Sequence, residues 1–504
     1  MVTLDQVTSS LLSAPSKTTP PSQSRIASSY HPLRSFDLPQ VRSYQQQYGD
    51  MYFLRLTKIK PQVEEIARDA WEGNVIAGEI VKKVERVLDV RQGELCWVTG
   101  TVYMDMALKP NILEDVSKDR WVVGPPVTQK YYSEDGSDQI MLEDESGRIL
   151  LVGKALDSVL LVTGCIISVM GTETANGELD VIDIKFPDLP PQPKRWTFDK
   201  PPTGNRDTEQ GNSMAPANSP SKKGSKLAIV SGLSFSGNDA SYALELNLLL
   251  EFLLGESGDP ALQSNLASVS RLIIAGNSIA NDEPKEKLTE DKEKKPAVKK
   301  YGYDSSTYNP VPSQLFDRFL FDLLPSMPIT VLPGPKDPAN VAYPQQPIHT
   351  AMFPLSRQYA AEPTKDGAKT GWLDTVSNPW EAEIDGWRVL GTAGQNVDDV
   401  FKYVGSDDRL GMMEAMCRWR CIAPTAPDTL YSYPFHDNDP FVIKDCPHLF
   451  FVGCQPSLST RVIEGSDGQR VRLVTIPSFS KTHEICLIDM ETLEVTKVKI
   501  NVHS

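Results

Sequence analysis

The second half of the chain contains four short apolar runs that each end in a glycine turn. They are Leu227–Leu233, Leu272–Ser278, Val331–Asp337 and Leu449–Pro456. A continuous apolar run bounded by a turn is typical of a buried strand. In α/β folds, the loops that follow such strands gather at the carboxyl edge of the sheet, where the chemistry is usually found. The four runs therefore predict a sheet with its loops collected at one edge.

Composition along the chain predicts two folded domains, because 504 residues exceed one ordinary core. Residues 1–40, rich in Ser, Thr, Pro and Gln, predict a disordered leader. We expect a first domain over 41–187, a Pro/Gly/Ser-rich linker over 188–225 and a second domain over 226–504. Residues 281–300 are rich in Lys and Glu without an apolar face, which favours a solvated charged insertion over a nuclear-targeting or partner-docking segment.

The first domain is predicted to be a small β-barrel that follows an N-terminal helix at Pro61–Trp71. Its strand candidates are Leu95–Tyr103, Ile140–Glu143, Ile149–Val152, Leu160–Met170 and Leu179–Phe186. Hairpin signals at 145–147 and 174–177 separate them. About five antiparallel strands favour a closed, OB-like barrel.

Barrels of this kind often bind single-stranded nucleic acid through stacking aromatics. Candidate stacking groups are Trp97, Tyr103, Trp121, Tyr131 and Tyr132. Trp97 lies in an alternating strand, which favours a core position, and the surrounding segment is acidic. Protein binding is therefore the favoured interpretation of the barrel over single-strand binding.

The second domain alternates strands with apolar helices at Ala240–Leu254 and Ser313–Leu324, which is the pattern of an α/β fold. After Lys444 the pattern becomes all β, ending in a hairpin over Ile485–Val498. The net charge of −15 argues against a generic polyanion binder. No apolar run reaches membrane-spanning length, so no membrane partner is predicted.

The seven cysteines are odd in number and scattered through apolar stretches, which favours reduced core thiols in an intracellular compartment. Cys417 and Cys421 are four residues apart on a predicted helix. No second pair or histidine lies near them in sequence, so buried thiols are favoured over a zinc site.

A calcineurin-like metallophosphoesterase holds two cations with Asp, His and Asn ligands from loops that follow successive strands. Laid on this chain, most ligand positions carry other residues: Ser231, Leu233, Asn277, Pro335, Lys336, Cys454 and Pro456, with Asp337 as the one acid. A further histidine position falls in the loop Ala423–Ala426, which has none.

Two divalent cations about 4 Å apart repel by on the order of 18 kcal/mol at an effective dielectric of 20, so several carboxylates must offset them. Asp337 alone does not, and Lys336 adds a positive charge. We therefore expect an inactivated phosphoesterase α/β sandwich with no metal, no cofactor and no catalytic residue.

Other catalytic motifs are weak. His349, His436, His448 and His483 stand alone, and a lone histidine is usually a surface or satisfied core group. The stretch Gly391–Asn396 lacks the Gly-Lys-Ser/Thr ending of a phosphate loop, which favours a tight turn after a strand at Trp387–Leu390.

An OB-like region followed by a phosphoesterase fold without its ligands resembles the B-subunits of the eukaryotic replicative DNA polymerases. Within that family, several strings are similar to the small subunits of DNA polymerase delta. They are Ser231–Leu233, Pro344–His349 with Met352–Leu355, Gly391–Val397, Pro424–Leu430 with Tyr433–Phe435, Asp445–His448 and Pro477–Ser480. The resemblance covers the chain from about Tyr44 to its end and departs in small ways, as at Cys454–Pro456.

The resemblance implies a non-catalytic scaffold in the nucleus. Such a scaffold holds the cysteine-rich C-terminal domain of the catalytic subunit of DNA polymerase delta and also a third, elongated subunit. In the family the same pair also serves the translesion polymerase zeta. DNA is then contacted only indirectly or weakly.

Other readings stay open from the residues. One is an active metal-dependent phosphodiesterase or nuclease, and another is a B-subunit of polymerase alpha or epsilon. A single-strand-binding module is a third.

Overall fold

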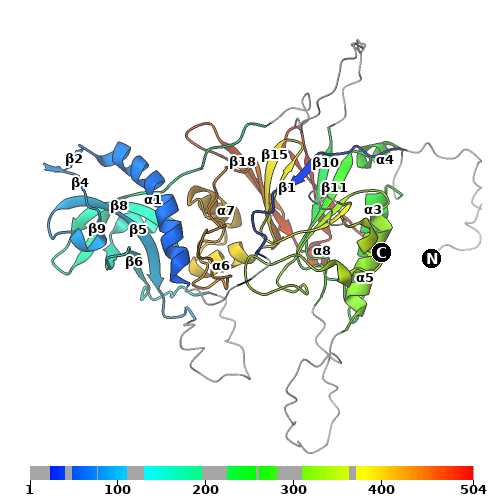
Figure 1. Cartoon of the computed structure of the whole chain (residues 1–504), viewed down its shortest axis with the longest axis horizontal. Helices are drawn as coiled ribbons and strands as arrows, with labels where there is room; N and C mark the ends of the chain where they lie inside the picture. Colours follow the sequence, from blue (N-terminus) through cyan, green and yellow to red (C-terminus); the bar gives the residue numbers. More distant parts are fainter. Residues whose placement is uncertain are drawn as a thin grey trace, which may run out of the picture.

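The computed structural model describes residues 23–39, 42, 48–76, 78–110, 130–195, 224–256, 260–280, 309–361 and 371–502. The predicted charged insertion at 281–300 lies outside these ranges, as do Trp121 and most of the predicted leader and linker. The barrel lies at one end of an elongated molecule, and a two-sheet sandwich forms the rest (Figure 1). Among the described helices, none has the length and apolar character needed to cross a membrane.

The first domain is the closed barrel that the strand pattern predicts. Its strands are β5 (Leu95–Asp105), β6 (Gln139–Glu143), β7 (Arg148–Val152), β8 (Ile166–Glu173) and β9 (Glu178–Lys185). The order is β5-β6-β7-β9-β8, and pairing of β5 with β8 closes the barrel. The prediction of an entirely antiparallel barrel is wrong at one place, because β7 and β9 pair in parallel. The short helix η3 (Lys154–Ser158) follows β7 and precedes β8, so β9 does not join β7 by a hairpin.

Short elements complete this end of the molecule. The strands β2 (Val75–Ile76) and β3 (Glu79–Ile80) form a small ribbon, β4 (Lys82–Lys83) pairs with β5, and η2 (Val87–Asp89) follows.

The helix that precedes the barrel is longer than predicted. α1 spans Gly49–Trp71 and contains Pro61 in its interior, so the prediction that it begins at Pro61 is wrong. A buried stripe continues through both halves of the helix, from Met51 to Trp71. Pro61 removes one backbone hydrogen bond, but Pro61 and Thr57 lie on the exposed face, where water can hydrate the freed carbonyl. Burial of the stripe therefore holds the helix through the proline.

The second domain is a sandwich of two six-stranded sheets. The first sheet has the order β13 (Leu373–Thr375), β12 (Ile329–Leu332), β11 (Val269–Ala275), β10 (Lys226–Val230), β19 (Glu484–Asp489) and β20 (Val495–Lys499). The second has the order β1 (Tyr30–Pro32), β14 (Trp380–Ile384), β15 (Trp387–Thr392), β16 (Leu449–Gln455), β18 (Arg470–Pro477) and β17 (Ser459–Glu464). In both sheets the central strands are parallel: β10 to β13 in the first, and β15, β16 and β18 in the second.

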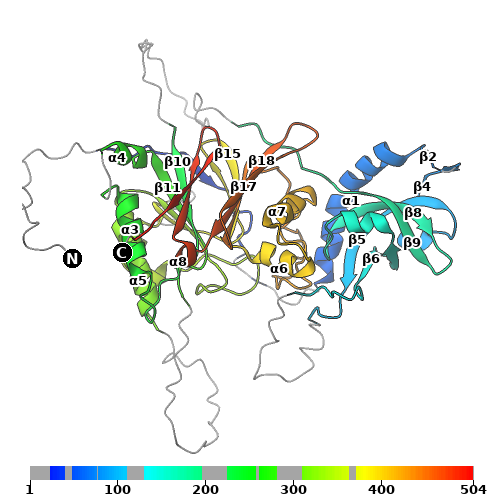
Figure 2. The same ribbon diagram turned by 180° about the vertical axis from the view of Figure 1, so that it is seen from behind.

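Apolar side chains from both sheets form the core between them, including Ile229, Ile273, Val389 and Phe451. Helices cover the two outer faces (Figure 2). α3 (Ala243–Leu254), α4 (Pro260–Leu266) and α5 (Val311–Leu323) lie beside the first sheet, and α6 (Gln395–Tyr403) and α7 (Arg409–Arg418) lie between the second sheet and the barrel. The remaining short helices are η5 (Thr350–Met352), η6 (Ser356–Tyr359) and α8 (Phe479–Thr482).

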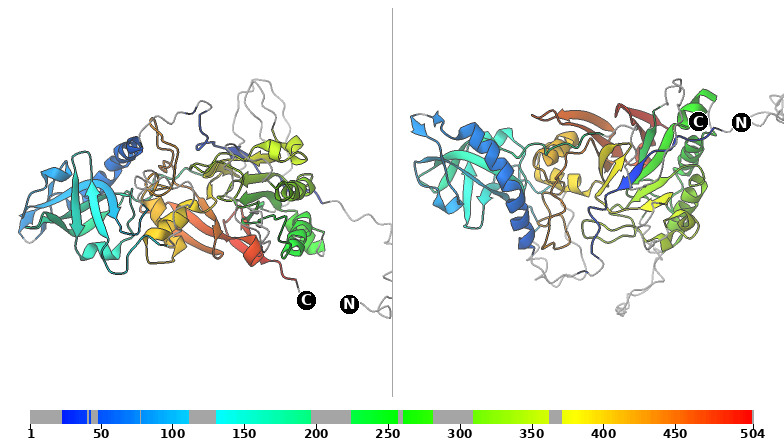
Figure 3. Two further views of the ribbon diagram at one scale, coloured as in Figure 1. Left: turned by 90° about the horizontal axis from the view of Figure 1, so that it is seen from below. Right: turned by 45° about the horizontal axis from the view of Figure 1, so that its top comes forward.

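Residues 23–39 of the predicted leader belong to the sandwich instead. β1 pairs antiparallel with β14, and the N-terminal segment crosses the sandwich beside it (Figure 3). The guanidinium of Arg25 donates to the carbonyl oxygens of Leu266 at 2.9 Å and Val269 at 3.3 Å. The segment shows no apolar period because a three-residue strand and single anchors hold it.

The first part of the predicted linker is also fixed. Leu189 is buried, and the backbone N–H of Cys446 donates to the carbonyl oxygen of Pro191 at 2.9 Å. The chain therefore leaves the barrel along the surface of the sandwich as far as Arg195, the last residue described before the gap.

The barrel and the sandwich share one hydrophobic core. Val98, Leu142 and Cys165 of the barrel belong to the same buried cluster as Val397 and Met412 of α6 and α7. This continuity implies that the two domains behave as one rigid body, since separating them exposes apolar surface to water.

Candidate functional site

The four glycine turns meet, as predicted, but at the carboxyl edges of two sheets and not of one. β10, β11 and β12 are neighbours in the first sheet, and β16 delivers the fourth turn from the second sheet. Backbone hydrogen bonds join the first two turns: Gly232 N–H donates to the Gly276 carbonyl at 2.9 Å, and Ser234 N–H donates to the Asn277 carbonyl at 3.0 Å. The turns are thus packed directly on one another.

Glycine is required in these turns by close packing. A Cβ at Gly453 would collide with the carbonyl oxygen of Ala275, and a Cβ at Gly276 would collide with the Ala393 side chain. Gly276 also has φ +83°, which an L side chain rarely adopts. The glycines therefore have a structural explanation that is independent of any ligand.

Ser231 is fully buried, and its hydroxyl forms hydrogen bonds with backbone groups. The hydroxyl lies 3.0 Å from the Pro477 carbonyl oxygen, to which it donates, and accepts from the N–H of Cys454 at 2.9 Å. This side chain ties the turn after β10 to Cys454 near the end of β16. It is a structural crosslink between the two sheets.

Cys454 lies beside these groups with its sulfur 3.8 Å from the carbonyl oxygens of Ala275 and Gly276. Burial, together with the negative charges of Asp337 and Asp398, raises the pKa of the Cys454 thiol to about 12. The thiol is therefore protonated at neutral pH, and a protonated thiol is a poor metal ligand and nucleophile.

Asp337, the single acid of the predicted site, holds its own loop together. Its two carboxylate oxygens accept hydrogen bonds from the N–H groups of Ile279 and Gly334, both at 2.8 Å. Burial raises the pKa of Asp337 to about 6, although backbone N–H groups act in the opposite direction. The carboxylate is ionised at pH 7, and its charge is stabilised by loop amides.

The remaining predicted positions point in different directions. The Asn277 side-chain oxygen accepts from the Lys336 N–H at 3.0 Å, and Leu233 is buried in the apolar core beside α3 and α5. Pro335, Lys336 and Pro456 are exposed. The structure brings the turns together, but it does not aim these side chains at one point.

The loop Ala423–Ala426, the predicted position of the further histidine, contacts the helix before the barrel. Its Pro424 carbonyl accepts a hydrogen bond from the Arg55 guanidinium at 2.6 Å. Among the residues that the structure describes, no group of three or more His, Cys, Asp or Glu side chains is arranged to hold a metal ion.

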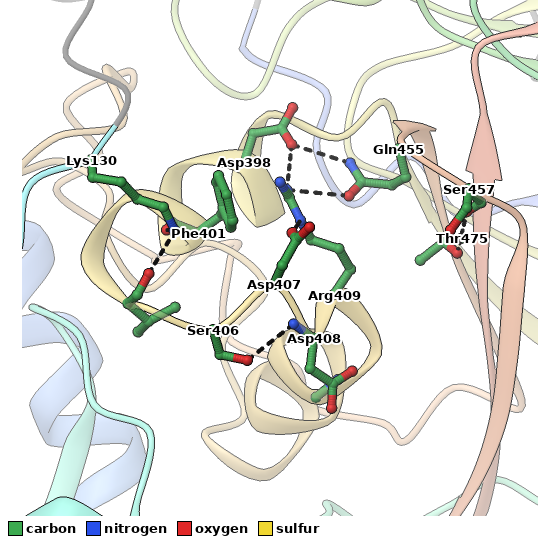
Figure 4. Close-up of polar contacts among 12 residues, drawn as sticks. Lys130, Asp398, Phe401, Ser406, Asp407, Asp408, Arg409, Gln455, Ser457 and Thr475 are labelled. Atoms are coloured by element: carbon green, nitrogen blue, oxygen red, sulfur yellow. Dashed lines mark hydrogen bonds and ion pairs between the residues drawn. The ribbon is translucent and has the colours of Figure 1, made fainter.

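A polar cluster beside the fourth turn was not predicted from the sequence (Figure 4). Arg409 of α7 bonds Asp398 of α6 at 2.8 Å and the Gln455 amide oxygen at 3.4 Å, and Gln455 donates to Asp398 at 3.3 Å. The Phe401 ring contacts both Arg409 and Lys130, with the cationic groups 3.7 Å and 3.2 Å from its centre. This cluster ties the turn after β16 to α6, α7 and the barrel side.

Burial raises the pKa of Asp398, and the positive charge of Arg409 opposes that shift. Arg409 therefore supplies the charge that neutralises this half-exposed carboxylate. The sequence pointed only to Gln455, which lies in the fourth glycine turn. Its partners Arg409 and Asp398 lie 46 and 57 residues away along the chain, so no local pattern indicates them.

Most of the aromatic candidates of the barrel are buried or contact other side chains. Trp97 and Tyr131 are buried, as expected for Trp97 from its strand pattern. Tyr103 is half-buried, with Lys109 and Arg148 at 4.4 Å and 4.3 Å from its ring centre. The described part of the barrel thus presents no row of free stacking rings. Cys417 and Cys421 are buried free thiols, as the sequence indicated.

Comparison with known proteins finds two matching families. Residues 47–184 match the family described as DNA polymerase delta subunit OB-fold domain, which confirms the predicted OB barrel. Residues 227–460 match the family described as the B-subunits of DNA polymerases alpha and epsilon.

Similar proteins from other organisms are named as the small subunit or subunit 2 of DNA polymerase delta. The chain is 34% identical to the DNA polymerase delta small subunit of Saccharomyces cerevisiae, over 92% of this chain and 91% of that protein. It is 34% identical to the small subunit of Arabidopsis thaliana, over 93% and 95%. It is 33% identical to DNA polymerase delta subunit 2 of Drosophila melanogaster, over 95% and 99%.

Proposed function

The chain belongs to the family of DNA polymerase delta small subunits, and on that premise we propose that it is a non-catalytic scaffold subunit of DNA polymerase delta. Its sandwich is a phosphoesterase-like fold that has lost its metal ligands. It takes part in DNA replication and repair by holding other subunits together, and it acts in the nucleus.

The state of the four turns carries the proposal. The Asp337 carboxylate accepts hydrogen bonds from two loop amides, and the Ser231 hydroxyl forms hydrogen bonds with backbone groups. Cys454 is protonated at neutral pH. The polar groups at this edge therefore stabilise one another, and among the described residues no set of carboxylates there is arranged to offset two cations.

Metal analysis tests the loss of the site. We expect the purified chain, equilibrated with Mn²⁺ and dialysed, to retain no stoichiometric metal, and to show no hydrolysis of a phosphodiester substrate. Asp337→Ala serves as the comparison. Two cations per chain, or a hydrolysis rate that Asp337→Ala abolishes, would instead establish an active phosphodiesterase or nuclease.

The proposed partners are the catalytic subunit of DNA polymerase delta, through its cysteine-rich C-terminal domain, and a third, elongated subunit. The polymerase zeta catalytic subunit shares the same scaffold. The shared core of barrel and sandwich supports this role, because a rigid body presents surfaces from both domains without an ordering cost. The net charge of −15 supports DNA contact that is only indirect or weak.

A pull-down with the metal-loaded C-terminal domains of the polymerase delta, alpha and epsilon catalytic subunits tests the assignment. We expect the delta domain to be retained at micromolar concentration, and the alpha and epsilon domains to be lost in the wash. Preferential retention of either other domain would reassign the chain to that polymerase. A fluorescently tagged chain tests the nuclear location.

A further inference from the structure

A basic pocket lies at the edge of the second sheet where β15, β16 and β18 begin, opposite the four turns. The cavity has a volume of about 610 Å³. Its charged lining consists of Lys194, Arg195, Arg470 and Arg472 against the single acid Asp467. Four cations around one cavity contrast with the net charge of −15 for the chain. The pocket is therefore a local exception to an acidic molecule.

One wall of the basic pocket is the segment that leaves the barrel, and it is fixed in place. The Gln192 amide donates to the Arg470 carbonyl at 2.8 Å, and its oxygen accepts from the Arg470 N–H at 3.0 Å. The Arg195 guanidinium donates to the Met490 carbonyl at 3.0 Å and lies 4.2 Å from the Trp387 ring centre. The pocket is thus formed before any ligand arrives.

Two of the four cations form ion pairs, and two do not. Arg195 pairs with Glu491 at 3.3 Å, and Arg470 pairs with Glu464 at 3.2 Å. Within the described residues, the side chains of Lys194 and Arg472 make no ion pair or hydrogen bond.

The Nε atom of Arg472 is moreover buried without an acceptor. Glu494 is the acid whose charge acts on Arg472, while burial and Arg470 lower the pKa of the guanidinium. The residue lines the cavity, so the charge of its guanidinium is available to an incoming anion.

The uncharged part of the lining includes apolar side chains. Pro191, Trp387 and Leu493 line the same cavity. Burial lowers the pKa of His448, whose Nδ1 accepts from the Arg388 N–H at 3.1 Å, so the imidazole is neutral at pH 7. The pocket therefore combines unpaired cations with apolar surface, which suits a ligand that carries both kinds of group.

A second cavity continues from the basic pocket and favours a polypeptide ligand. It has a volume of about 740 Å³, shares Pro191 and Asp467 with the first, and reaches Ile59 and Ile66 of α1. A nucleic acid strand needs a continuous row of cations along its phosphates. The second cavity instead mixes both charges, with the acids Glu65, Asp69, Asp188 and Asp467 beside the bases Lys58, Arg420 and Lys444.

We propose that the basic pocket binds an acidic segment of a partner polypeptide, with two negative side chains on Lys194 and Arg472 and apolar neighbours in the adjoining cavity. The negative groups are carboxylates or phosphorylated side chains. The proposal goes beyond the scaffold role and does not depend on which polymerase subunits the chain holds.

Fluorescence anisotropy of the full chain tests this site. The probe is a labelled 12-residue peptide with four glutamates spaced among leucines. Comparison probes are the same peptide with two phosphoserines in place of two glutamates, and a 12-nucleotide single strand. The variant K194Q/R472Q removes both unpaired cations. K82Q/R91Q removes one Lys and one Arg that are exposed on the barrel side, so it is matched for charge and residue type.

We expect K194Q/R472Q to weaken peptide binding by about tenfold, since two charge-assisted contacts are lost. K82Q/R91Q changes it less than about twofold, as remote exposed charges do. Tighter binding of the phosphorylated peptide identifies phosphate as the favoured source of charge. If K194Q/R472Q unfolds in a melting control, the exposed single variant K194Q carries the test with a loss of about threefold.

Equal losses in the two double variants would overturn the proposal, as would absence of peptide binding. Tighter binding of the single strand, lost in K194Q/R472Q, would overturn it in favour of nucleic acid. The pull-down with catalytic-subunit domains tests the scaffold proposal independently of the peptide-binding proposal. Either proposal can therefore fail while the other stands.

Discussion

Arg55 of α1 and Asp439 of the second domain form an ion pair that water does not reach. Their side chains are 1% and 0% exposed, and Nε lies 2.8 Å from the carboxylate oxygen. The Pro424 carbonyl accepts a second hydrogen bond from the guanidinium, and the other carboxylate oxygen accepts from the Phe441 N–H at 2.9 Å. The two charges therefore neutralise each other only while the barrel side and the sandwich stay together, although Nη2 of Arg55 is buried without a hydrogen-bond partner.

Removing one partner leaves the other charge buried and unpaired, which costs about 3–5 kcal/mol. We expect Arg55→Met and Asp439→Asn each to lower the free energy of unfolding by about that amount. This is a large fraction of the roughly 5–15 kcal/mol that stabilises a typical protein. The double variant should cost clearly less than the sum of the two, because it leaves no unpaired charge.

Urea unfolding followed by tryptophan fluorescence measures these differences, since Trp97 reports on the barrel and Trp419 on the second domain. Arg68→Met is the matched control, because Arg68 pairs with Glu72 on the exposed side of the same helix. It should cost less than about 1 kcal/mol. A cost for Arg55→Met no greater than for Arg68→Met would refute the reasoning. Unfolding of barrel and sandwich in two separate transitions would refute the shared core.

Three further predictions concern the sandwich. Burial raises the pKa of Asp337 above its unfolded value, so the stability it contributes at low pH is lost as pH rises from about 4 to 6. Urea unfolding should therefore show Asp337→Asn gaining about 2 kcal/mol on the wild type between pH 4 and pH 7. Gly453→Ala should cost about 3 kcal/mol in thermal unfolding because its methyl meets a backbone carbonyl, whereas Gly49→Ala, with open space around it, should be near neutral. Tyr30→Ala should cost about 3 kcal/mol because a buried aromatic ring and its hydrogen bond are lost, whereas His31→Ala on the exposed side of β1 should have little effect. A pH-independent difference between Asp337→Asn and the wild type would contradict the first prediction. Costs for Gly453→Ala or Tyr30→Ala equal to those of their controls would contradict the other two.

Regular patterns made most of the elements predictable. The four apolar runs became β10, β11, β12 and β16, and four of the five barrel strands lie close to their predicted ranges. The prediction Leu160–Met170 is wrong at its start, because β8 begins at Ile166. The elements that were missed have weak local signals. β1 has three residues and is held by distant groups, such as the Tyr30 hydroxyl, which donates to Asp374 at 2.6 Å. The first half of α1 was missed because Pro61 resembles a helix start, while a buried stripe decides the helix.

The candidate site was predictable in position and only partly in its contacts. Strand ends in parallel sheets fix where the turns meet, and this follows from the sequence pattern. The hydrogen-bond partners do not follow from it. Ser231 bonds Cys454 across 223 residues, and Arg409 reaches Gln455 across 46. Such pairings depend on the packing of two sheets and two helices, which no local pattern encodes.

The polar groups at the strand ends of the sandwich satisfy one another. Asp337 does so with two loop amides, and Arg409 does so for Asp398. Each solution joins separate elements: two turns of the first sheet in one case, and α6, α7 and the end of β16 in the other. A site stabilised by internal bonds holds its geometry whether or not an ion is present. The strand ends of the sandwich are therefore held in place by hydrogen bonds and ion pairs of the chain itself.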